Sequence, residues 1–276
     1  MKAICCALLS LLMLFSCFAL AEEEEDFDAY SRLIDVPGVG TLQYYAQNDP
    51  NWRNTYYEPE KSKSHRFMEG SGCGPTTVAM AIANQVPLSR LPELTAYARN
   101  PEKGFRFCPC SCVAECLHPK EHEIMTADTL QDYIGWLPVI LANYATGNNH
   151  LNGKFRTEEA GTNIQLLKYL CEDYGIAYSS AHDFDEALAA LRKGASVITT
   201  CKNNCFIKNS HYLYLAGADD TYLYIFDCLE KDHYGRDSKG YIEVLEPGFV
   251  RVKLEDVPAI RMYGFYMCAE DASVFE

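Results

Sequence analysis

The feature that most constrains this fold is a stretch at residues 69–83, which reads EGSGCGPTTVAMAIA. Glycines flank the cysteine at position 73 and can take backbone angles closed to other residues, so the sequence predicts a sharp turn there. Pro75 suits the first turn of a helix, where its missing N–H leaves no partner unsatisfied. Every residue from Val78 to Ala83 is apolar and small or medium-sized, which predicts a helix buried on all sides.

Cys73 would therefore stand at the N-terminus of a helix that enters the core. The free N–H groups and the positive end of the helix dipole favour the thiolate, which is the nucleophilic form of cysteine. The alternative is a structural cysteine that packs at the start of a helix. The segment alone leaves both interpretations open.

Length and charge set the limits for the rest of the chain. The 276 residues suffice for one large domain or two small ones with an ample core. The formal net charge of −14 argues against a nucleic-acid partner, whose phosphates would be repelled.

The N-terminus, residues 1–21, has the pattern of a cleaved export signal. Lys2 is followed by an apolar run and by Ala19-Leu20-Ala21, a small-x-small cleavage pattern before an acidic run. The apolar run is short for a membrane span, so we expect a secreted or extracytoplasmic protein. As an alternative, residues 14–17 resemble a bacterial lipoprotein box, which would lipidate Cys17 and anchor the protein at the outer face of a membrane.

Export bears on the cysteines, because an oxidising compartment favours disulfides. Of the thirteen cysteines, Cys5, Cys6 and Cys17 lie in the signal, and setting Cys73 aside leaves an odd number that cannot all pair within the chain. A dense cluster consists of Cys108, Cys110, Cys112 and Cys116, followed by His118 and His122. This density suggests zinc, but the spacing matches no common zinc pattern. We expect disulfides there, with a structural metal or free thiols as the alternatives.

The order of elements along the chain predicts an α+β fold. We expect an acidic leader at 22–38, then a single domain at 39–276 with a Cys-rich insertion at about 100–162 that lies over the core. Helices are expected at 92–99, at 163–174 ending at Gly175, and at 184–191 closed by Gly194. Strands are expected at 39–46, 197–200, 211–216, 222–227, 241–245, 249–254 and 264–267. A chain in which helices come first and an antiparallel sheet follows has an α+β arrangement.

The segments 211–216 and 222–227 alternate as strands do and are joined by a short polar connection, which predicts a β-hairpin. A three-residue turn would set His211 directly opposite Asp227, with their Cβ atoms roughly 5 Å apart on one face. A carboxylate placed so fixes the tautomer of the imidazole and orients its second nitrogen. A two-residue turn would set His211 opposite Cys228 instead, so the prediction depends on register. The alternative is an ordinary His–Asp pair at a sheet edge.

Three blocks of sequence resemble a known family: residues 45–52, residues 72–80, and His211–Gly217 followed by Phe226-Asp227. Together they resemble the papain-like cysteine peptidases of the bacteriocin-processing, double-glycine-leader type, and in particular the stand-alone branch that lacks the transporter. The resemblance covers most of residues 43–270, with the 100–162 segment outside it. The family often has Asp-Pro where this chain has Asp227-Cys228, a departure that keeps the carboxylate.

The resemblance implies a papain-like fold, with a central Cys-bearing helix packed on a C-terminal antiparallel sheet. By position, Cys73 would be the nucleophile, His211 the general base and acid, and Asp227 the residue that orients the imidazole. The side-chain amide of Gln47 and the backbone N–H of Cys73 would form the oxyanion hole. Gln47 has an alternative role as a turn residue that satisfies the local backbone. The interval between Cys73 and His211 fits the roughly 130–150 residues of the papain pattern.

We therefore expect an exported, monomeric cysteine peptidase that hydrolyses peptide or isopeptide bonds in a peptide or protein substrate. We expect neither a cofactor nor a catalytic metal, and membrane contact only through a lipid anchor at Cys17. Two alternatives remain open. The same scaffold would perform acyl transfer, joining chains instead of cutting them, or it would be a non-catalytic binding module stapled by disulfides.

Overall fold

The computed structural model of the protein describes residues 30–54, 57, 67–86, 137–146, 155–157, 161–203, 206–231, 234 and 240–276. The expected export signal, Cys17, the start of the leader, the helix at 92–99 and the cysteine cluster at 108–116 lie outside these residues. None of the helices in the described part of the chain is long and apolar enough to cross a bilayer.

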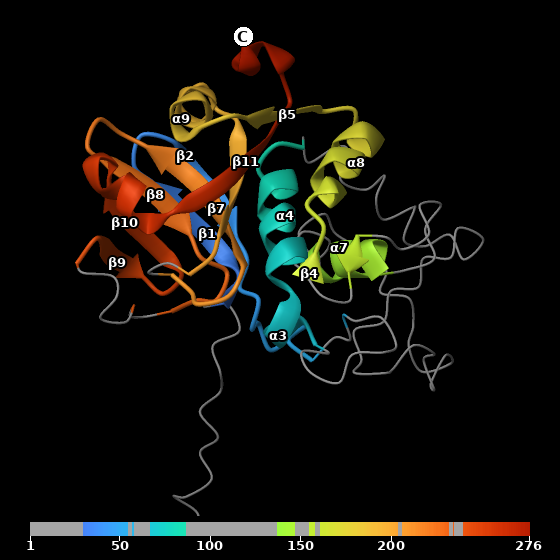
Figure 1. Cartoon of the computed structure of the whole chain (residues 1–276). Helices are drawn as coiled ribbons and strands as arrows, with labels where there is room; N and C mark the ends of the chain where they lie inside the picture. Colours follow the sequence, from blue (N-terminus) through green and yellow to red (C-terminus); the bar gives the residue numbers. More distant parts are fainter. Residues whose placement is uncertain are drawn as a thin grey trace, which may run out of the picture.

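A seven-stranded sheet dominates the structure, and every neighbouring pair of its strands is antiparallel (Figure 1). Its spatial order is β5 (Ala177–Ala181), β11 (Met262–Ala269), β6 (Ser196–Cys201), β7 (His211–Ala218), β8 (Tyr222–Phe226), β10 (Phe249–Lys253) and β9 (Ile242–Glu246). Six of these strands were expected. The edge strand β5 was not, because its sequence, AYSSA, is polar and small and lacks apolar alternation.

Helices cover both faces of the sheet. One face carries α4 (Cys73–Ala83), α7 (Leu137–Thr146) and α8 (Gln165–Tyr174), which share one apolar core with the sheet (Figure 1). The other face carries α9 (Phe184–Arg192), which packs into a second core. The α+β class predicted from the order of elements is thereby confirmed.

Strand β7 separates the two cores, because successive side chains of a strand point to opposite faces. Leu213 and Leu215 pack into the core beneath α9, whereas Tyr214 and Ala216 pack into the core that contains α4. The expectation that alternate residues of this hairpin share a face is confirmed.

The ends of α8 and α9 follow local capping rules. Gly175 closes α8 in the left-handed conformation with φ 61°, which glycine adopts without steric cost. At the start of α9 the carboxylate of Asp183 accepts from the N–H of Glu186, while the Glu186 carboxylate accepts from the N–H of His182. Such reciprocal bonds satisfy N–H groups that have no partner within the helix.

An N-terminal hairpin, β1 (Arg32–Val36) and β2 (Gly40–Tyr44), begins inside the segment that we expected to be a leader. Ile34 and Val36 are buried in the core that contains α4, while their neighbours Leu33 and Asp35 are exposed. The ordered fold therefore starts at least as early as β1. The acidic composition of the preceding residues concealed the short period-two pattern.

The interval 100–162, expected to be an insertion over the core, contains α7. This helix packs directly against α4, and Leu137, Leu141 and Tyr144 are fully buried. Residues 137–146 are therefore part of the main core, where they cover the side of α4 that faces away from the sheet (Figure 1).

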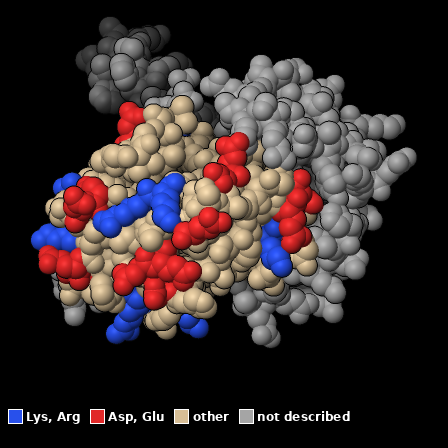
Figure 2. All heavy atoms as spheres, turned by 90° about the horizontal axis from the view of Figure 1, so that it is seen from above, with Lys and Arg blue, Asp and Glu red and all other residues tan. Residues whose placement is uncertain are grey.

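Short elements complete the described chain. They are the helix α3 (Met68–Ser71), the two-stranded ladder of β3 (Arg156–Thr157) and β4 (Gly161–Thr162), and the 3-10 helices η3 (Leu254–Ile260) and η4 (Ala272–Phe275). Acidic and basic side chains are interspersed over the face seen in Figure 2.

Candidate active site

Helix α4 carries Cys73 as its first residue and supports it from within the core. All residues from Gly74 to Ile82 are buried, as expected, while Cys73 itself is only partly buried. Pro75 lies in the first turn, and the Thr76 hydroxyl donates to the carbonyl of Gly72 over 2.8 Å. Cys73 therefore lies at the less buried end of a helix that the core otherwise encloses.

The glycines around Cys73 serve close packing, which corrects our expectation of unusual backbone angles. Gly72 has φ −81° and ψ 7°, which any residue can adopt. A Cβ on Gly72 would lie 2.6 Å from the Met68 carbonyl oxygen, and one on Gly74 would lie 2.1 Å from the Thr162 hydroxyl. In place of an isolated sharp turn, α3 leads through Gly72 directly into α4.

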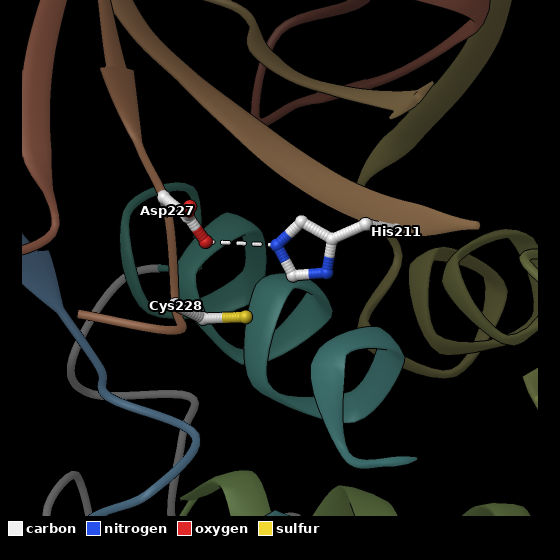
Figure 3. A group of neighbouring side chains, drawn as sticks. All are labelled: His211, Asp227 and Cys228. Carbon is white, nitrogen blue, oxygen red and sulfur yellow. Dashed lines mark hydrogen bonds and ion pairs between the residues drawn. The ribbon is translucent and has the colours of Figure 1, made fainter. Parts of the chain in front are cut away.

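His211 and Asp227 meet in the interior, at the ends of β7 and β8. His211 is 2% exposed and Asp227 is completely buried. The two side chains are joined by a bond of 2.8 Å between His211 Nε2 and Asp227 Oδ1 (Figure 3). With Nε2 bonded to the carboxylate, Nδ1 remains for a second partner.

The register of the hairpin differs from the predicted one. The three-residue turn would have paired Leu215 with Leu223, but Leu215 lies opposite Ile225 and the ladder ends at Tyr214 and Phe226. A bulge between Leu215 and Gly217 adds an extra residue to β7. His211 is therefore directly opposite neither Asp227 nor Cys228, and it reaches the carboxylate diagonally.

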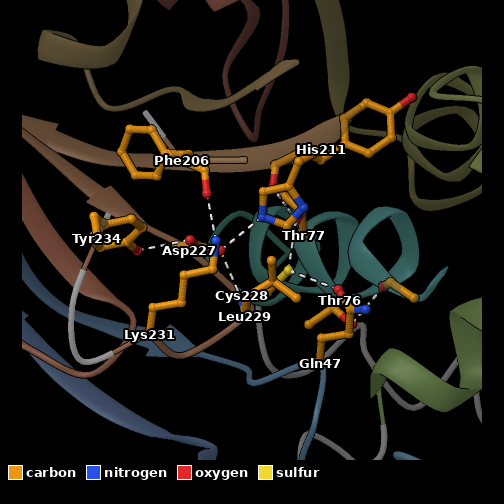
Figure 4. Close-up of polar contacts among 12 residues, drawn as sticks. Gln47, Thr76, Thr77, Phe206, His211, Asp227, Cys228, Leu229, Lys231 and Tyr234 are labelled. Atoms are coloured by element: carbon orange, nitrogen blue, oxygen red, sulfur yellow. Dashed lines mark hydrogen bonds and ion pairs between the residues drawn. The ribbon is translucent and has the colours of Figure 1, made fainter. Parts of the chain in front are cut away.

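Asp227 is held by several donors in addition to His211. The N–H of Leu229 donates to Oδ1 over 3.0 Å, and the hydroxyl of Tyr234 donates to Oδ2 over 2.8 Å (Figure 4). Burial disfavours the carboxylate, but the charge and hydrogen bond of His211, with the Leu229 N–H and the charge of Lys231, hold the pKa of Asp227 below its ordinary value. Tyr234 was not found from the sequence, because no local pattern links it to Asp227.

Cys73 is hydrogen-bonded to His211, so the structure brings the expected thiol and imidazole together. Burial opposes ionisation, yet the hydrogen bond and charge of His211, together with backbone bonds from Tyr212 and Gly74, lower the pKa of Cys73. Burial likewise opposes the imidazolium, but the charge and hydrogen bond of Asp227, and then Cys73, raise the pKa of His211 to about 9. Both shifts favour an ion pair of thiolate and imidazolium.

Gln47 lies between α3 and the turn that follows Asp227, and it is 2% exposed. Its amide nitrogen donates to the carbonyl of Glu69 over 2.6 Å, and its amide oxygen lies 3.5 Å from the thiol of Cys228. Its backbone N–H donates to the carbonyl of Cys228 over 2.6 Å. These contacts fix the orientation of the amide next to the segment that leads into Cys73, and they also fulfil the backbone role that we considered as the alternative.

Cys228 is a second thiol in the site and is completely buried. It receives a weak contact from the Thr77 hydroxyl at 3.9 Å (Figure 4). Burial, followed by the charges of Cys73 and Asp227, raises the pKa of Cys228 well above its ordinary value. The pKa shifts of the two thiols therefore run in opposite directions, and ionisation is favoured at Cys73 over Cys228.

All five cysteines in the described residues are free: Cys73, Cys171, Cys201, Cys228 and Cys268. The expected disulfides thus have no counterpart among them, and the other cysteines of the chain, including the cluster at 108–116, lie outside the described residues.

Comparison with known proteins adds no assignment. No protein-family model matches the chain. No curated protein sequence matches it either.

Proposed function

We propose that the protein is a papain-like cysteine peptidase, in which Cys73 is the nucleophile, His211 the general base and acid, and Asp227 the residue that orients the imidazole. One observation carries the proposal. The thiol of a partly buried cysteine at the start of a buried helix is bonded to an imidazole whose Nε2 is bonded to a buried carboxylate. A nucleophile, a base and a group that orients the base are the parts that acyl transfer through a covalent intermediate requires.

The proposed reaction has two steps. The Cys73 thiolate attacks the carbonyl carbon of a peptide or isopeptide bond, and His211 gives its proton to the leaving amine. His211 then takes a proton from water, and the resulting hydroxide releases the acyl group and regenerates the thiol. Because Asp227 occupies Nε2, the proton moves through Nδ1, the ring nitrogen that remains for Cys73.

Gln47 is proposed to stabilise the negative oxygen of the tetrahedral intermediate, together with the backbone N–H of Cys73. One N–H of its amide is bonded to Glu69, and within the described residues the second N–H has no partner. An amide held in place before the reaction stabilises charge without reorganising in the transition state.

Selective alkylation tests this proposal. With the reduced full-length chain, iodoacetamide at neutral pH should modify Cys73 first, and Cys73→Ser should abolish the fast phase, as mapped by mass spectrometry of the labelled peptides. Cys171→Ala, which removes a buried thiol of α8, is the matched control and should leave the fast phase unchanged.

Hydrolysis is then measured on a peptide library, with and without an added amine. Cleaved products that require Cys73 and His211 support a peptidase, whereas products that carry the amine indicate acyl transfer. A chain whose Cys73 reacts no faster than a free thiol in solution would overturn the catalytic assignment and leave a binding module.

A further inference from the structure

The proposed reaction assigns no role to one buried side chain of the site, the thiol of Cys228. A nitrogen of His211, a carboxylate oxygen of Asp227 and the Sγ of Cys228 all lie within 4.8 Å of one another. Figure 3 shows the Cys228 side chain directed towards the imidazole of His211. Nitrogen, oxygen and sulfur donors are thus concentrated at one point in the interior.

Cys73 lies outside this group of three but brings a second sulfur to His211. Its thiol is hydrogen-bonded to His211, and the Sγ of Cys228 lies within 4.8 Å of a nitrogen of His211, so both thiols lie next to the same imidazole. Two cysteines and a histidine are the donors that zinc prefers, at about 2.3 Å from sulfur and about 2.0–2.1 Å from nitrogen. Cys73 is partly exposed, which gives an ion access to an otherwise buried site.

We propose that Cys73, His211 and Cys228 bind one thiophilic divalent cation such as Zn²⁺. This ion inhibits the enzyme because it occupies the thiol of Cys73, the nucleophile. The ion would not be a cofactor, since it blocks the thiol that the reaction needs. The claim that the ion inhibits the enzyme rests on the proposed function, whereas the claim that the ion binds rests on the donor set alone.

The surrounding residues suit such a site. Asp227 stays on Nε2, as carboxylates do behind metal-bound histidines, where they fix the ring and raise its basicity. The amide oxygen of Gln47, 3.5 Å from Cys228 Sγ, offers a further oxygen donor. The positive charge of Lys231 lowers the pKa of Asp227, and the Nζ of Lys231 donates to the carbonyl of Phe206 (Figure 4).

Charge and protons balance. Coordination replaces the proton shared by Cys73 and His211 and the proton of the Cys228 thiol, because a divalent cation deprotonates the thiols that it binds. The two resulting thiolates neutralise the cation, and the carboxylate of Asp227 offsets the charge of Lys231.

Cobalt titration tests binding without any activity. The reduced full-length chain is titrated with Co²⁺ under anaerobic conditions, and the thiolate-to-cobalt charge-transfer absorption is recorded. Because the segment at 108–116 carries further thiols, the site is read as the difference between the wild-type chain and each single variant. Cys228→Ser and Cys73→Ser should each lose the same increment, and Cys171→Ala should lose none. An unchanged spectrum in Cys228→Ser would overturn the site.

Inhibition is measured on the same variants, each compared with its own metal-free rate. Cys228→Ser should raise the Zn²⁺ concentration for half-inhibition at least about tenfold. Losing a hydrogen-bond partner of a metal ligand already costs about 10–100-fold in metal affinity, and losing the ligand itself should cost no less. For the wild-type chain, Zn²⁺ should also slow alkylation of Cys73, and a chelator should restore it, which tests the site without a folding-sensitive variant.

The outcomes separate the two proposals. A chain that binds Co²⁺ through Cys228 but cleaves no peptide refutes the peptidase and keeps the metal site. A chain that cleaves peptides with the same Zn²⁺ sensitivity in wild type and Cys228→Ser refutes the metal site and keeps the peptidase.

Discussion

At the scale of single residues, the two pKa shifts of the Cys73–His211 pair define a pH range for activity. The pKa of Cys73 is lowered, so the thiolate should be lost at a lower pH than for an ordinary thiol, and alkylation should stay fast where a free thiol is already protonated. The pKa of His211 is about 9, so hydrolysis should decline as pH rises through that value, when the imidazolium that protonates the leaving amine is lost. Rates of alkylation and hydrolysis from pH 5 to 10 check both limbs.

Asp227→Asn should move the alkaline limb to lower pH, because the carboxylate charge raises the pKa of His211, and should cut hydrolysis on the order of 100-fold or more. Asp220→Asn, at an exposed turn position, is the control and should keep the wild-type profile. A profile for Asp227→Asn that superimposes on the wild type would contradict the role of Asp227.

Gln47 permits a test that separates catalysis from structure. Gln47→Ala should lower kcat on the order of 100–1,000-fold, the usual cost of losing one oxyanion donor. Alkylation of Cys73 should be unaffected, since that reaction forms no oxyanion. If Gln47 only supports the turn through its bond to Glu69, stability and alkylation should fall together with turnover.

At the scale of elements, much of the fold was readable from the sequence and the hairpin register was not. Helices α8 and α9 are amphipathic and end at Gly175 and shortly before Gly194, signals that act within a few residues. The bulge at Leu215 has no such local signal. Next to the turn Ala218 lies opposite Leu223, three residues from the predicted pairing, and the bulge reduces the error to two residues at Tyr214 and Phe226. An even shift leaves these side chains on their predicted faces, and His211 and Asp227 still meet.

Close packing of the element that carries Cys73 can be tested at Gly74. A Cβ there would lie 2.1 Å from Thr162 Oγ1 and 2.2 Å from its Cβ, so Gly74→Ala should cost about 1–3 kcal/mol, typical of overpacking. Denaturant unfolding provides the measurement. In the double-mutant cycle, Thr162→Gly should remove most of the added cost, and purely additive effects would exclude a clash as the cause.

At the scale of the whole molecule, the site depends on contacts between segments far apart in the sequence, which no local pattern encodes. Tyr44 of β2 donates to the carbonyl of Asp227, and the backbone of Gln47 donates to that of Cys228. The thiol was predicted from its place at the start of a buried helix, the imidazole and the carboxylate from their pairing in a hairpin, and all three from the family resemblance. Their supports, such as Tyr234, are ordinary residues whose role exists only once the chain has folded.

Arg32 ties the N-terminal hairpin to the loop behind the site. Its guanidinium bonds to Glu230 at 2.8 Å, to Glu246 at 3.3 Å and to the carbonyl of Pro247 at 2.6 Å. Burial raises the pKa of Glu230, Arg32 opposes this, and the charges of Asp49 and Glu246 add to it, giving a pKa of about 7. Because the folded protein holds this proton more tightly than the unfolded chain, the associated stability is present below the ordinary pKa of glutamate and is lost as pH rises through about 7.

Arg32→Ala should therefore lower the free energy of unfolding more at pH 8 than at pH 5. At pH 8 it leaves the Glu230 carboxylate charged and without its cation, at a cost of about 1–3 kcal/mol, between an exposed and a fully buried pair. At pH 5 the carboxyl is protonated and needs the cation less. Glu230→Gln in the Arg32→Ala background should restore most of the loss at pH 8, whereas Arg251→Ala, which breaks an exposed pair with Glu243, should change little at either pH. Equal losses at the two pH values for Arg32→Ala would show that the hairpin is held by its apolar contacts at Ile34 and Val36 and not by this ion pair.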